Sequence, residues 1–132
     1  MDEDTVTEIA NLFQQHRDEL GFVNSAQVRE KTTHHKRCDG NVVGAAIVNH
    51  CVRKPQTTLY DIAVDEDHRR EGIASSLIDE IADDSPHDKI IAKCPQELDA
   101  NGFYHRTGWE LHDTEDGKNR FLNVWKYSIG DE

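Results

Sequence analysis

Apolar residues near the N-terminus recur at the spacing of a helix. They form one stripe that comprises Val6, Ile9, Ala10, Phe13 and Leu20. Thr5 followed by Glu8 predicts a capping box at the start of this helix. Asn24 followed by Gln27 repeats the pairing, so we predict a second helix over 25–31.

The next stretch predicts strands. The segment 39–41, Asp-Gly-Asn, is a turn signal between a short edge strand near 34–38 and a clear apolar strand over 42–48. Pro55 then marks a further hairpin. The chain therefore passes from a helical period to a strand period within its first half.

Residues 58–82 predict a strand, a charged turn and an amphipathic helix. The strand is a run of Leu59, Tyr60, Ile62, Ala63 and Val64 that only Asp61 interrupts. The helix carries on one face Ile73, Leu77, Ile78 and Ile81. Gly72 in the turn lets backbone N–H groups approach an anion, and the helix start adds partial positive charge. Because Arg69 and Arg70 add full charges, this layout favours a pyrophosphate ligand.

The second half of the chain continues the alternation. Residues 89–94 predict a buried strand, and 100–109 follow as a short helix. Two more strands, 109–111 and 120–127, are expected around the polar turn 113–118. The predicted order is α-α-β-β-β-α-β-α-β-β, which belongs to the α/β (α+β) class.

Two short motifs in this order resemble the signatures of one enzyme family. Arg69-x-x-Gly72-x-Ala74 after a strand is similar to the coenzyme A motif of the Gcn5-related N-acetyltransferases (GNAT), which reads Arg/Gln-x-x-Gly-x-Gly/Ala. The segment 100–109 is similar to the family's later motif, Ala-x-x-Phe/Leu-Tyr-x-x-x-Gly-Phe, with Trp109 as the last aromatic residue. Two ordered signatures at matching spacing are far more specific than either alone.

The resemblance implies a fold and an activity. The fold is that of the acyl-CoA N-acyltransferases, in which helices flank a mixed central sheet that splays between the cofactor strand and the next strand. The activity is direct transfer of the acetyl group of acetyl-CoA to a primary amine in a ternary complex. The acceptor is then an amine-bearing small molecule or a protein or peptide, and homodimers are common in the family. Two alternatives stay open: a non-catalytic acyl-CoA-binding sensor or interaction module of the same fold, and an unrelated α/β module.

The cofactor residues that the resemblance implies act mostly through backbone groups. They are Ile62, Ala63 and Val64 for the acetyl and pantetheine parts, and Arg69, Arg70, Glu71, Gly72, Ile73, Ala74 and Ser75 for the pyrophosphate. Relatives carry an asparagine seven residues before the motif tyrosine, where this chain has Glu97. Asn101 lies closer to that tyrosine and is the candidate for contact with the pantetheine arm.

Two side chains are candidates for proton transfer. Tyr104 matches the family tyrosine near the cofactor sulfur, which implies a general acid for the leaving thiolate. Its alternative is an aromatic core residue paired with Phe103. Asp61, a carboxylate inside an apolar strand, is the candidate general base, and its alternative is a structural carboxylate bonded to neighbouring backbone. His50 and His105 are further candidates for the base.

Charge restricts the partners. The chain has 26 acidic and 15 basic residues and a formal net charge of −11, which argues against nucleic acid as a partner. His68, Arg69 and Arg70 nevertheless form a local basic spot where the pyrophosphate is expected. The remaining acidity suits either a cationic acceptor or adaptation to the salty cytoplasm of a halophile.

Length and apolar runs restrict the organisation. A chain of 132 residues suits a single domain, 1–132, with one modest core. No apolar run approaches the roughly 20 residues of a membrane span and the start is too acidic for a signal peptide, so we expect a cytoplasmic protein without a membrane partner. The three cysteines lack metal-type spacing, and His34, His35 and Cys38 lack a fourth ligand. We therefore predict reduced thiols, no metal and a solvated edge near His34.

Overall fold

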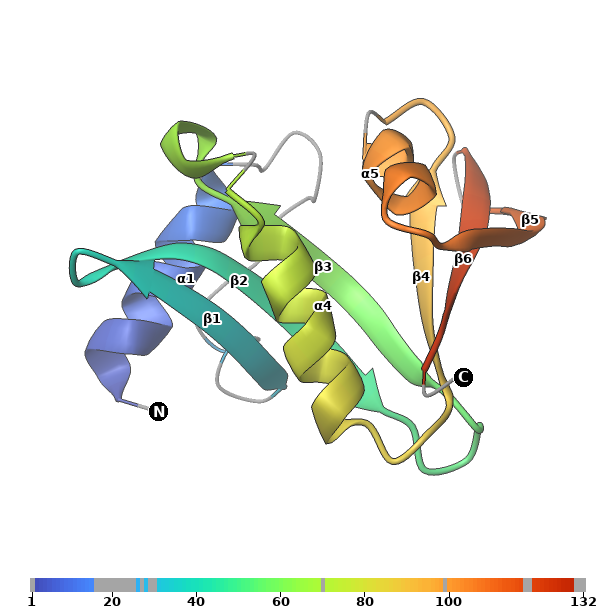
Figure 1. Cartoon of the computed structure of the whole chain (residues 1–132), viewed down its shortest axis with the longest axis horizontal. Coiled ribbons are helices and arrows are strands. Elements are labelled where there is room, and N and C mark those ends of the chain that lie inside the picture. The colour runs from blue at the N-terminus through green and yellow to red at the C-terminus, as the bar shows by residue number, and fades with distance from the viewer. Residues whose placement is uncertain are drawn as a thin grey trace. The chain divides into compact units, whose positions relative to one another are not determined.

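One mixed sheet runs through the described part of the chain, which comprises residues 2–15, 26, 28, 31–69, 71–98, 100–117 and 120–129 of this computed structural model. Its six strands follow the order β1-β2-β3-β4-β6-β5 (Figure 1). The strands are β1 (Thr32–Cys38), β2 (Asn41–His50), β3 (Thr57–Val64), β4 (Lys89–Pro95), β5 (Glu110–Asp116) and β6 (Phe121–Ser128). The helices are α1 (Glu3–Gln14), the 3₁₀ helix η1 (Glu66–His68), α4 (Ile73–Asp84) and α5 (Ala100–Arg106). The predicted fold class, a mixed sheet flanked by helices, is confirmed.

The chain divides into two compact units. The first consists of Met1–Asn49 and Tyr60–Asp84, and the second of His50–Leu59 and Ser85–Glu132. Strand β3 contributes to both units, because the boundary falls between Leu59 and Tyr60. The organisation of the whole chain as a single domain stays a prediction.

Helix α1 of the first unit begins earlier than expected. Asp2 is its N-cap, and the Asp2 Oδ1 atom accepts a hydrogen bond of 2.7 Å from the Thr5 backbone N–H. The predicted capping box is wrong, because Thr5 lies buried within the helix. The Glu8 carboxylate instead accepts hydrogen bonds of 3.1 Å from Arg37 and from the Val42 backbone N–H. Aspartate caps helices at least as well as threonine, so sequence alone does not choose between the two positions.

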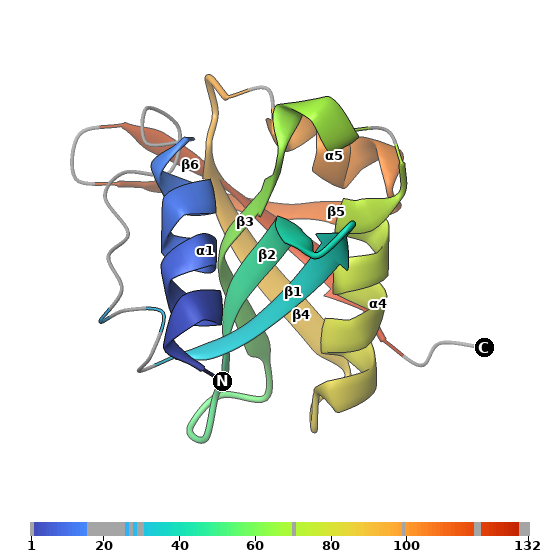
Figure 2. The same ribbon diagram turned by 90° about the vertical axis from the view of Figure 1, so that its left-hand side faces the viewer.

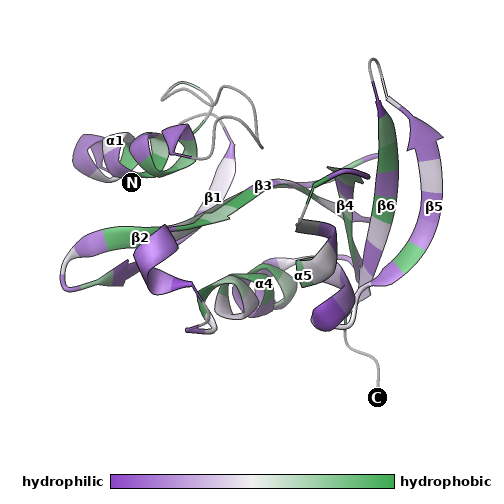
Figure 3. Ribbon diagram, turned by 90° about the horizontal axis from the view of Figure 1, so that it is seen from above, coloured by the Kyte–Doolittle hydropathy of each residue, from purple (hydrophilic) through white to green (hydrophobic). Residues whose placement is uncertain are grey.

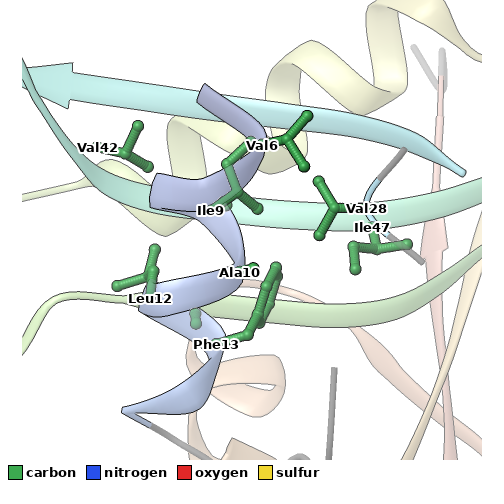
Figure 4. Close-up of a cluster of buried hydrophobic side chains, with 10 residues drawn as sticks. Val6, Ile9, Ala10, Leu12, Phe13, Val28, Val42 and Ile47 are labelled. Carbon is green, nitrogen blue, oxygen red and sulfur yellow. The ribbon is translucent and has the colours of Figure 1, made fainter. Parts of the chain in front are cut away.

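Helices α1 and α4 cover opposite faces of strands β1 and β2 (Figures 2 and 3). Side chains of α1 pack against β2 in the core of the first unit (Figure 4). The cluster comprises Val6, Ile9, Ala10, Leu12, Phe13, Val28, Val42, Ala45, Ile47 and Ala63. The predicted apolar stripe is thus confirmed up to Phe13, and Leu20 lies outside the described residues. Of the predicted second helix, 25–31, only Ala26, Val28 and Lys31 are described. Ala26 and Val28 are helical, whereas Lys31 lies in a bend just before β1.

The turn between β1 and β2 has the backbone that its sequence predicts. Asp39 has φ 53° and Gly40 has φ 85°, and positive φ at both central residues is typical of a tight hairpin turn. The two strands pair antiparallel from Thr32 opposite Val48 to Cys38 opposite Asn41. Both strands are longer than predicted, because the ladder begins at Thr32 rather than at His34 in β1 and because β2 extends from Asn41 to His50.

His34 links the edge strand β1 to helix α4. Its buried ring has Nδ1 3.4 Å from Glu80 Oε1 and Nε2 3.5 Å from Asp84 Oδ2. Lys36 forms an ion pair with the same Glu80. Burial lowers the pKa of His34, and Asp84 opposes this shift. The predicted solvated edge is therefore wrong at His34, because α4 covers this part of the strand.

Strand β4 is the centre of the second unit. It pairs antiparallel with β6 along its whole length, Lys89–Pro95. Its parallel pairing with β3 is much shorter and joins residues 57–59 to residues 90–92. Strand β3 continues to Val64, beyond this ladder. A short ladder between these two strands is what the expected splay requires.

Strand β5, at the end of the sheet, is longer than predicted. The prediction ended this strand at Leu111 and placed a turn at 113–118, but the strand spans Glu110–Asp116. All seven of its side chains are exposed, and it pairs with β6 along one edge. Hydropathy does not detect such a strand, because backbone hydrogen bonds rather than buried side chains define it.

Candidate functional site

Strand β3 of the first unit ends in a hydrogen-bonded corner. The backbone N–H of Asp65 donates to the carbonyl of Val43 on β2 at 2.8 Å. The Asp65 side chain accepts a hydrogen bond of 2.9 Å from the Asp67 N–H, and this caps η1. The His68 N–H donates to the Asp65 carbonyl at 2.9 Å. These bonds fix the point where the chain leaves residues 62–64 and turns toward α4.

The turn between η1 and α4 carries both signs of charge. The Nδ1 atom of His68 lies 3.2 Å from Glu71 Oε1. When His68 is protonated, this contact neutralises the acidic side chain that directly precedes Gly72. Arg69 is exposed at the same turn, and Arg70 lies outside the described residues. Of the three residues in the predicted basic spot, the structure therefore describes His68 and Arg69.

Gly72 gives the turn its shape and leaves it open. Its φ is +79°, a conformation that L side chains rarely adopt, and no atom of the described residues lies within 4 Å of a Cβ added there. Its carbonyl accepts the first helical hydrogen bond, 2.9 Å from the Ser76 N–H. The N–H groups of Ile73, Ala74 and Ser75 precede that bond, and the first turn of α4 carries no acidic residue. These amides form a ready site for an anion.

Gly44 on β2 allows α4 to start close to the sheet. A Cβ added at Gly44 would overlap Cγ2 of Ile73 and would touch Leu77 at 3.4 Å. The side chain of Ile73 therefore packs over this glycine, as expected from its place on the apolar face. We did not single out Gly44 from the sequence, although an isolated glycine inside an apolar strand is a signal of close approach.

Replacement of Gly44 by alanine is expected to lower the free energy of unfolding by about 1–3 kcal/mol, because the added methyl group displaces Ile73. Urea unfolding followed by circular dichroism measures the change. The Ile73→Ala variant is the matched partner, since it removes the overlapping methyl group. In that background the Gly44→Ala change is expected to have less than half of its effect, and an equal loss in both backgrounds would contradict the packing explanation.

Asp61 lies half-buried on β3, next to the predicted cofactor residues. Burial raises the pKa of its carboxyl group to about 6. Among the described residues, none donates a hydrogen bond to this carboxylate, so the alternative of a backbone-bonded structural carboxylate gains no support. A carboxyl group that titrates near pH 6 can accept a proton under ordinary conditions.

Helix α5 of the second unit ends in a Schellman motif. The Trp109 N–H donates to the Tyr104 carbonyl at 3.0 Å, and the Gly108 N–H faces the His105 carbonyl at 3.5 Å. Gly108 has φ +89°, which this ending requires. The rings of Trp109 and Tyr104 supply the apolar contact of the motif, with centroids 4.9 Å apart. The Gly-aromatic pair of the second sequence motif is therefore a helix stop.

Tyr104 lies buried among aromatic rings. Its ring meets Phe103 edge-on with centroids 5.4 Å apart, and it stacks on Trp125 of β6 at 5.9 Å and 24°. The predicted pairing with Phe103 is thus present. Such packing is compatible with a phenol held in place for proton transfer, and the role of general acid stays a prediction.

Asn101 is bonded through both ends of its side-chain amide. Its Oδ1 atom accepts hydrogen bonds from Trp125 Nε1 at 2.9 Å and from Asn123 Nδ2 at 3.0 Å. Its Nδ2 atom donates to the carbonyl of Pro95 at the end of β4 and to the carbonyls of Gln96 and Leu98 in the turn that follows. Contact with a pantetheine arm stays a prediction and would compete with these bonds. The sequence pattern gave no sign of this network.

The predicted site residues fall into two groups. The first unit brings together Asp61, Ile62, Ala63, Val64, Arg69, Glu71, Gly72, Ile73, Ala74 and Ser75. The second unit brings together Asn101 and Tyr104. Of the other candidate bases, His50 has Nδ1 2.7 Å from Oγ1 of the buried Thr57, and His105 is exposed on α5.

The arrangement in the first unit suits a phosphate-containing cofactor, since a strand leads through a left-handed glycine into the N-terminus of a helix. The model of the acetyltransferase (GNAT) family matches residues 4–109. This match spans most of the chain and includes both motifs, so the chain belongs to the GNAT family of acetyltransferases. No curated protein sequence matches it.

Solved structures share this fold at low sequence identity. An aminoglycoside 6'-N-acetyltransferase complexed with coenzyme A gives a TM-score of 0.83 at 10% identity, over 99% of this chain and 95% of that chain. The ribosomal-protein-S18-alanine N-acetyltransferase from Escherichia coli gives a TM-score of 0.78 at 14% identity, over 100% of this chain and 92% of that chain. An acetyltransferase of the GNAT family from Streptococcus pneumoniae gives a TM-score of 0.76 at 13% identity, over 98% of this chain and 96% of that chain. These likenesses confirm the acyltransferase fold.

Neither a membrane-spanning helix nor a cluster of metal ligands occurs among the described residues. No helix there has the length and apolar character needed to cross a bilayer. No group of three or more His, Cys, Asp or Glu side chains is arranged there to hold a metal ion. Cys38, Cys51 and Cys94 all lie in described ranges and form no disulfide there, and Cys94 is buried.

Proposed function

We propose that the protein is an N-acetyltransferase that moves the acetyl group of acetyl-CoA to a primary amine. The observation that carries this proposal is the open, left-handed turn at Gly72 in a chain of the GNAT family. The amides that follow Gly72 would hold the pyrophosphate of the cofactor. Backbone groups of residues 62–64 would hold its acetyl and pantetheine parts.

The proposed reaction proceeds directly in a ternary complex. The amine nitrogen bonds to the thioester carbonyl carbon, the C–S bond breaks, and the electron pair of that bond leaves as a thiolate. Asp61 takes the proton that the amine must lose, and Tyr104 protonates the thiolate. A carboxyl pKa of about 6 suits the first role, and a phenol O–H, which can donate its proton, suits the second.

The acceptor is proposed only as a primary amine on a small molecule or on a protein or peptide. The neighbours described above are named for a ribosomal-protein alanine and for an aminoglycoside, which are amines of both kinds. A formal charge of −11 favours a cationic acceptor at moderate ionic strength. Salt dependence of KM for the acceptor therefore separates attraction by charge from adaptation to high salt.

Calorimetric titration of acetyl-CoA into the protein, at moderate and at high salt, tests the proposal. Saturable binding followed by thiol release in a screen of polyamines, aminoglycosides and lysine-rich peptides would support the enzyme. Saturable binding without thiol release for any amine would favour the non-catalytic sensor or interaction module of the same fold. Folded protein that binds no acetyl-CoA at either salt would overturn both.

Replacement of Tyr104 by phenylalanine is expected to lower kcat for acetyl transfer by about 10²-fold, because the thiolate loses its proton donor. The Kd for acetyl-CoA should change by less than about twofold, since the ring and its stacking contacts remain. Stopped-flow thiol release and calorimetry give the two values. Unchanged kcat would remove Tyr104 from the mechanism and leave the aromatic core as its sole role.

A further inference from the structure

The amide of Asn101 is the centre of a network that ends at Tyr104. Trp125 donates its indole N–H to Asn101 Oδ1 at 2.9 Å, and the same indole ring stacks on the Tyr104 ring. Trp109 packs edge-on against Tyr104 at 4.9 Å. We infer that Asn101 is a positioning residue for the proposed general acid, and that it acts through the indole of Trp125. This inference rests on the proposed function.

The stacking geometry leaves little freedom to the phenol. The Tyr104 and Trp125 ring planes are 24° apart, whereas the Tyr104 and Trp109 planes are 69° apart. Two indoles thus contact the tyrosine ring in different orientations. Trp109 is fixed by the backbone of the Schellman motif, but Trp125 lies on β6 and its indole is oriented by the hydrogen bond to Asn101.

The chemistry of this position calls for an amide. Its two N–H groups face three carbonyl oxygens, and its oxygen faces two N–H donors. A carboxylate at position 101 would meet the three carbonyls without a proton to offer. An apolar side chain would leave the buried N–H of Trp125 without its acceptor, which favours rotation of the indole. Both hydrogens and the oxygen of the side-chain amide therefore take part in hydrogen bonds.

The expected consequence is a change in turnover rather than in cofactor affinity. A proton donor displaced by about 1 Å loses much of its effect, even when the residue that moved it is remote from the chemistry. Weakening of the bond between Asn101 and Trp125 should therefore lower kcat and leave KM for acetyl-CoA nearly unchanged. A loss of folding would instead lower the fraction of active protein by the same factor whether residue 104 is tyrosine or phenylalanine.

The first test is a double-mutant cycle between Trp125 and Tyr104. Trp125→Phe keeps an aromatic ring against Tyr104 but removes the N–H donor, and it is expected to lower kcat by about tenfold. In the Tyr104→Phe background the same change should lower kcat by less than about twofold, because no acid is left to position. An equal loss in both backgrounds, or no loss in either, would overturn the inference.

The second test does not depend on turnover. In ¹H–¹⁵N spectra of the full chain the indole N–H of Trp125 is assigned with Trp125→Phe. Asn101→Ala is expected to shift this resonance and to accelerate its solvent exchange by at least about tenfold, together with a shift of the Tyr104 ring protons. Asn123→Ala is the matched control, since it removes the other donor to the same oxygen and leaves the Trp125 bond in place. Unchanged Tyr104 resonances in Asn101→Ala would overturn the inference.

The two tests distinguish this inference from the proposed function. Full activity of Tyr104→Phe would overturn both the role of Tyr104 as general acid and the positioning role of Asn101. Low activity of Tyr104→Phe beside normal activity of Trp125→Phe would overturn only the role of Asn101. Absence of turnover with every amine, with the expected spectral shifts, would overturn the catalytic role and reduce the network to a structural one.

Discussion

Gly72→Trp is expected to weaken binding of acetyl-CoA by at least about 100-fold in titration calorimetry, with the protein still folded. Two effects act together. The φ of +79° is unfavourable for any L side chain, and an indole at this open position would cover the amides of Ile73, Ala74 and Ser75. The pyrophosphate proposed for this turn would then lose its hydrogen-bond donors.

The chain offers a matched control for Gly72→Trp at the hairpin between β1 and β2. Gly40 has a similar φ of +85° and equally open surroundings, but it lies in a turn with no proposed contact to the cofactor. Gly40→Trp should therefore introduce similar strain and bind acetyl-CoA with the wild-type Kd. Glu71→Ala should change Kd by less than about threefold, because only the backbone of Glu71 is proposed to bind. Wild-type affinity of folded Gly72→Trp would exclude this turn as the cofactor site.

Asp61→Asn is expected to lower kcat/KM by about 10²- to 10³-fold at pH 8, because the amide cannot accept a proton from the amine. The pH profile carries the sharper expectation. In the wild type, kcat/KM should rise with pH through about 6 and then level off, following the raised pKa of this carboxyl group. The variant should lose this limb of the profile. A limb near pH 6 that persists in Asp61→Asn would assign the base to another group.

The same substitution is expected to stabilise the fold at high pH. The folded pKa of about 6 lies above the ordinary 3.8, so the contribution of Asp61 to stability is complete below pH 3.8 and is lost as the pH rises through 6. Asparagine removes this dependence. Asp61→Asn should therefore unfold with a free energy higher by on the order of 2 kcal/mol at pH 8, and with no gain near pH 4. Chemical unfolding at both pH values gives the comparison.

An activity loss joined to a stability gain is the signature of a functional buried charge. Ile62→Val is a suitable control on the same strand, since it changes packing slightly and leaves the charge of Asp61 in place. It should show neither the pH-dependent gain in stability nor the loss of the activity limb. A stability gain of equal size at pH 4 and pH 8 in Asp61→Asn would mean that ionisation of Asp61 is not its cause.

The parts of the fold that hydrophobic pattern defines were predictable. The apolar faces of α1 and α4, the buried strands β2 and β4, and the turn at Gly40 all follow from residue types in local sequence. Gly72 could be found for the same reason, since a strand, a glycine and a helix stand in order. The family motifs then assigned a ligand to that turn.

The parts that escaped prediction depend on contacts between distant residues. Asp2 rather than Thr5 caps α1, because Thr5 and Glu8 are occupied with Arg37 of the neighbouring strand. Two of the five side-chain hydrogen bonds of Asn101 come from β6 residues that lie 22 and 24 positions away, and no local pattern indicates them. The exposed strand β5 lacks the alternation of apolar and polar residues that reveals a half-buried strand.

Strand β5 also affects the tendency of the protein to aggregate. It is the last strand of the sheet, and four of its seven side chains are acidic: Glu110, Asp113, Glu115 and Asp116. A second copy that paired along this edge would bring like charges together, which discourages the growth of an intermolecular sheet. Lys93 pairs with Glu115 at 2.9 Å and offsets only part of this charge. Since the Debye length falls from about 10 Å at 0.1 M salt to about 3 Å at 1 M, the acidic edge discourages such pairing most strongly in dilute buffer.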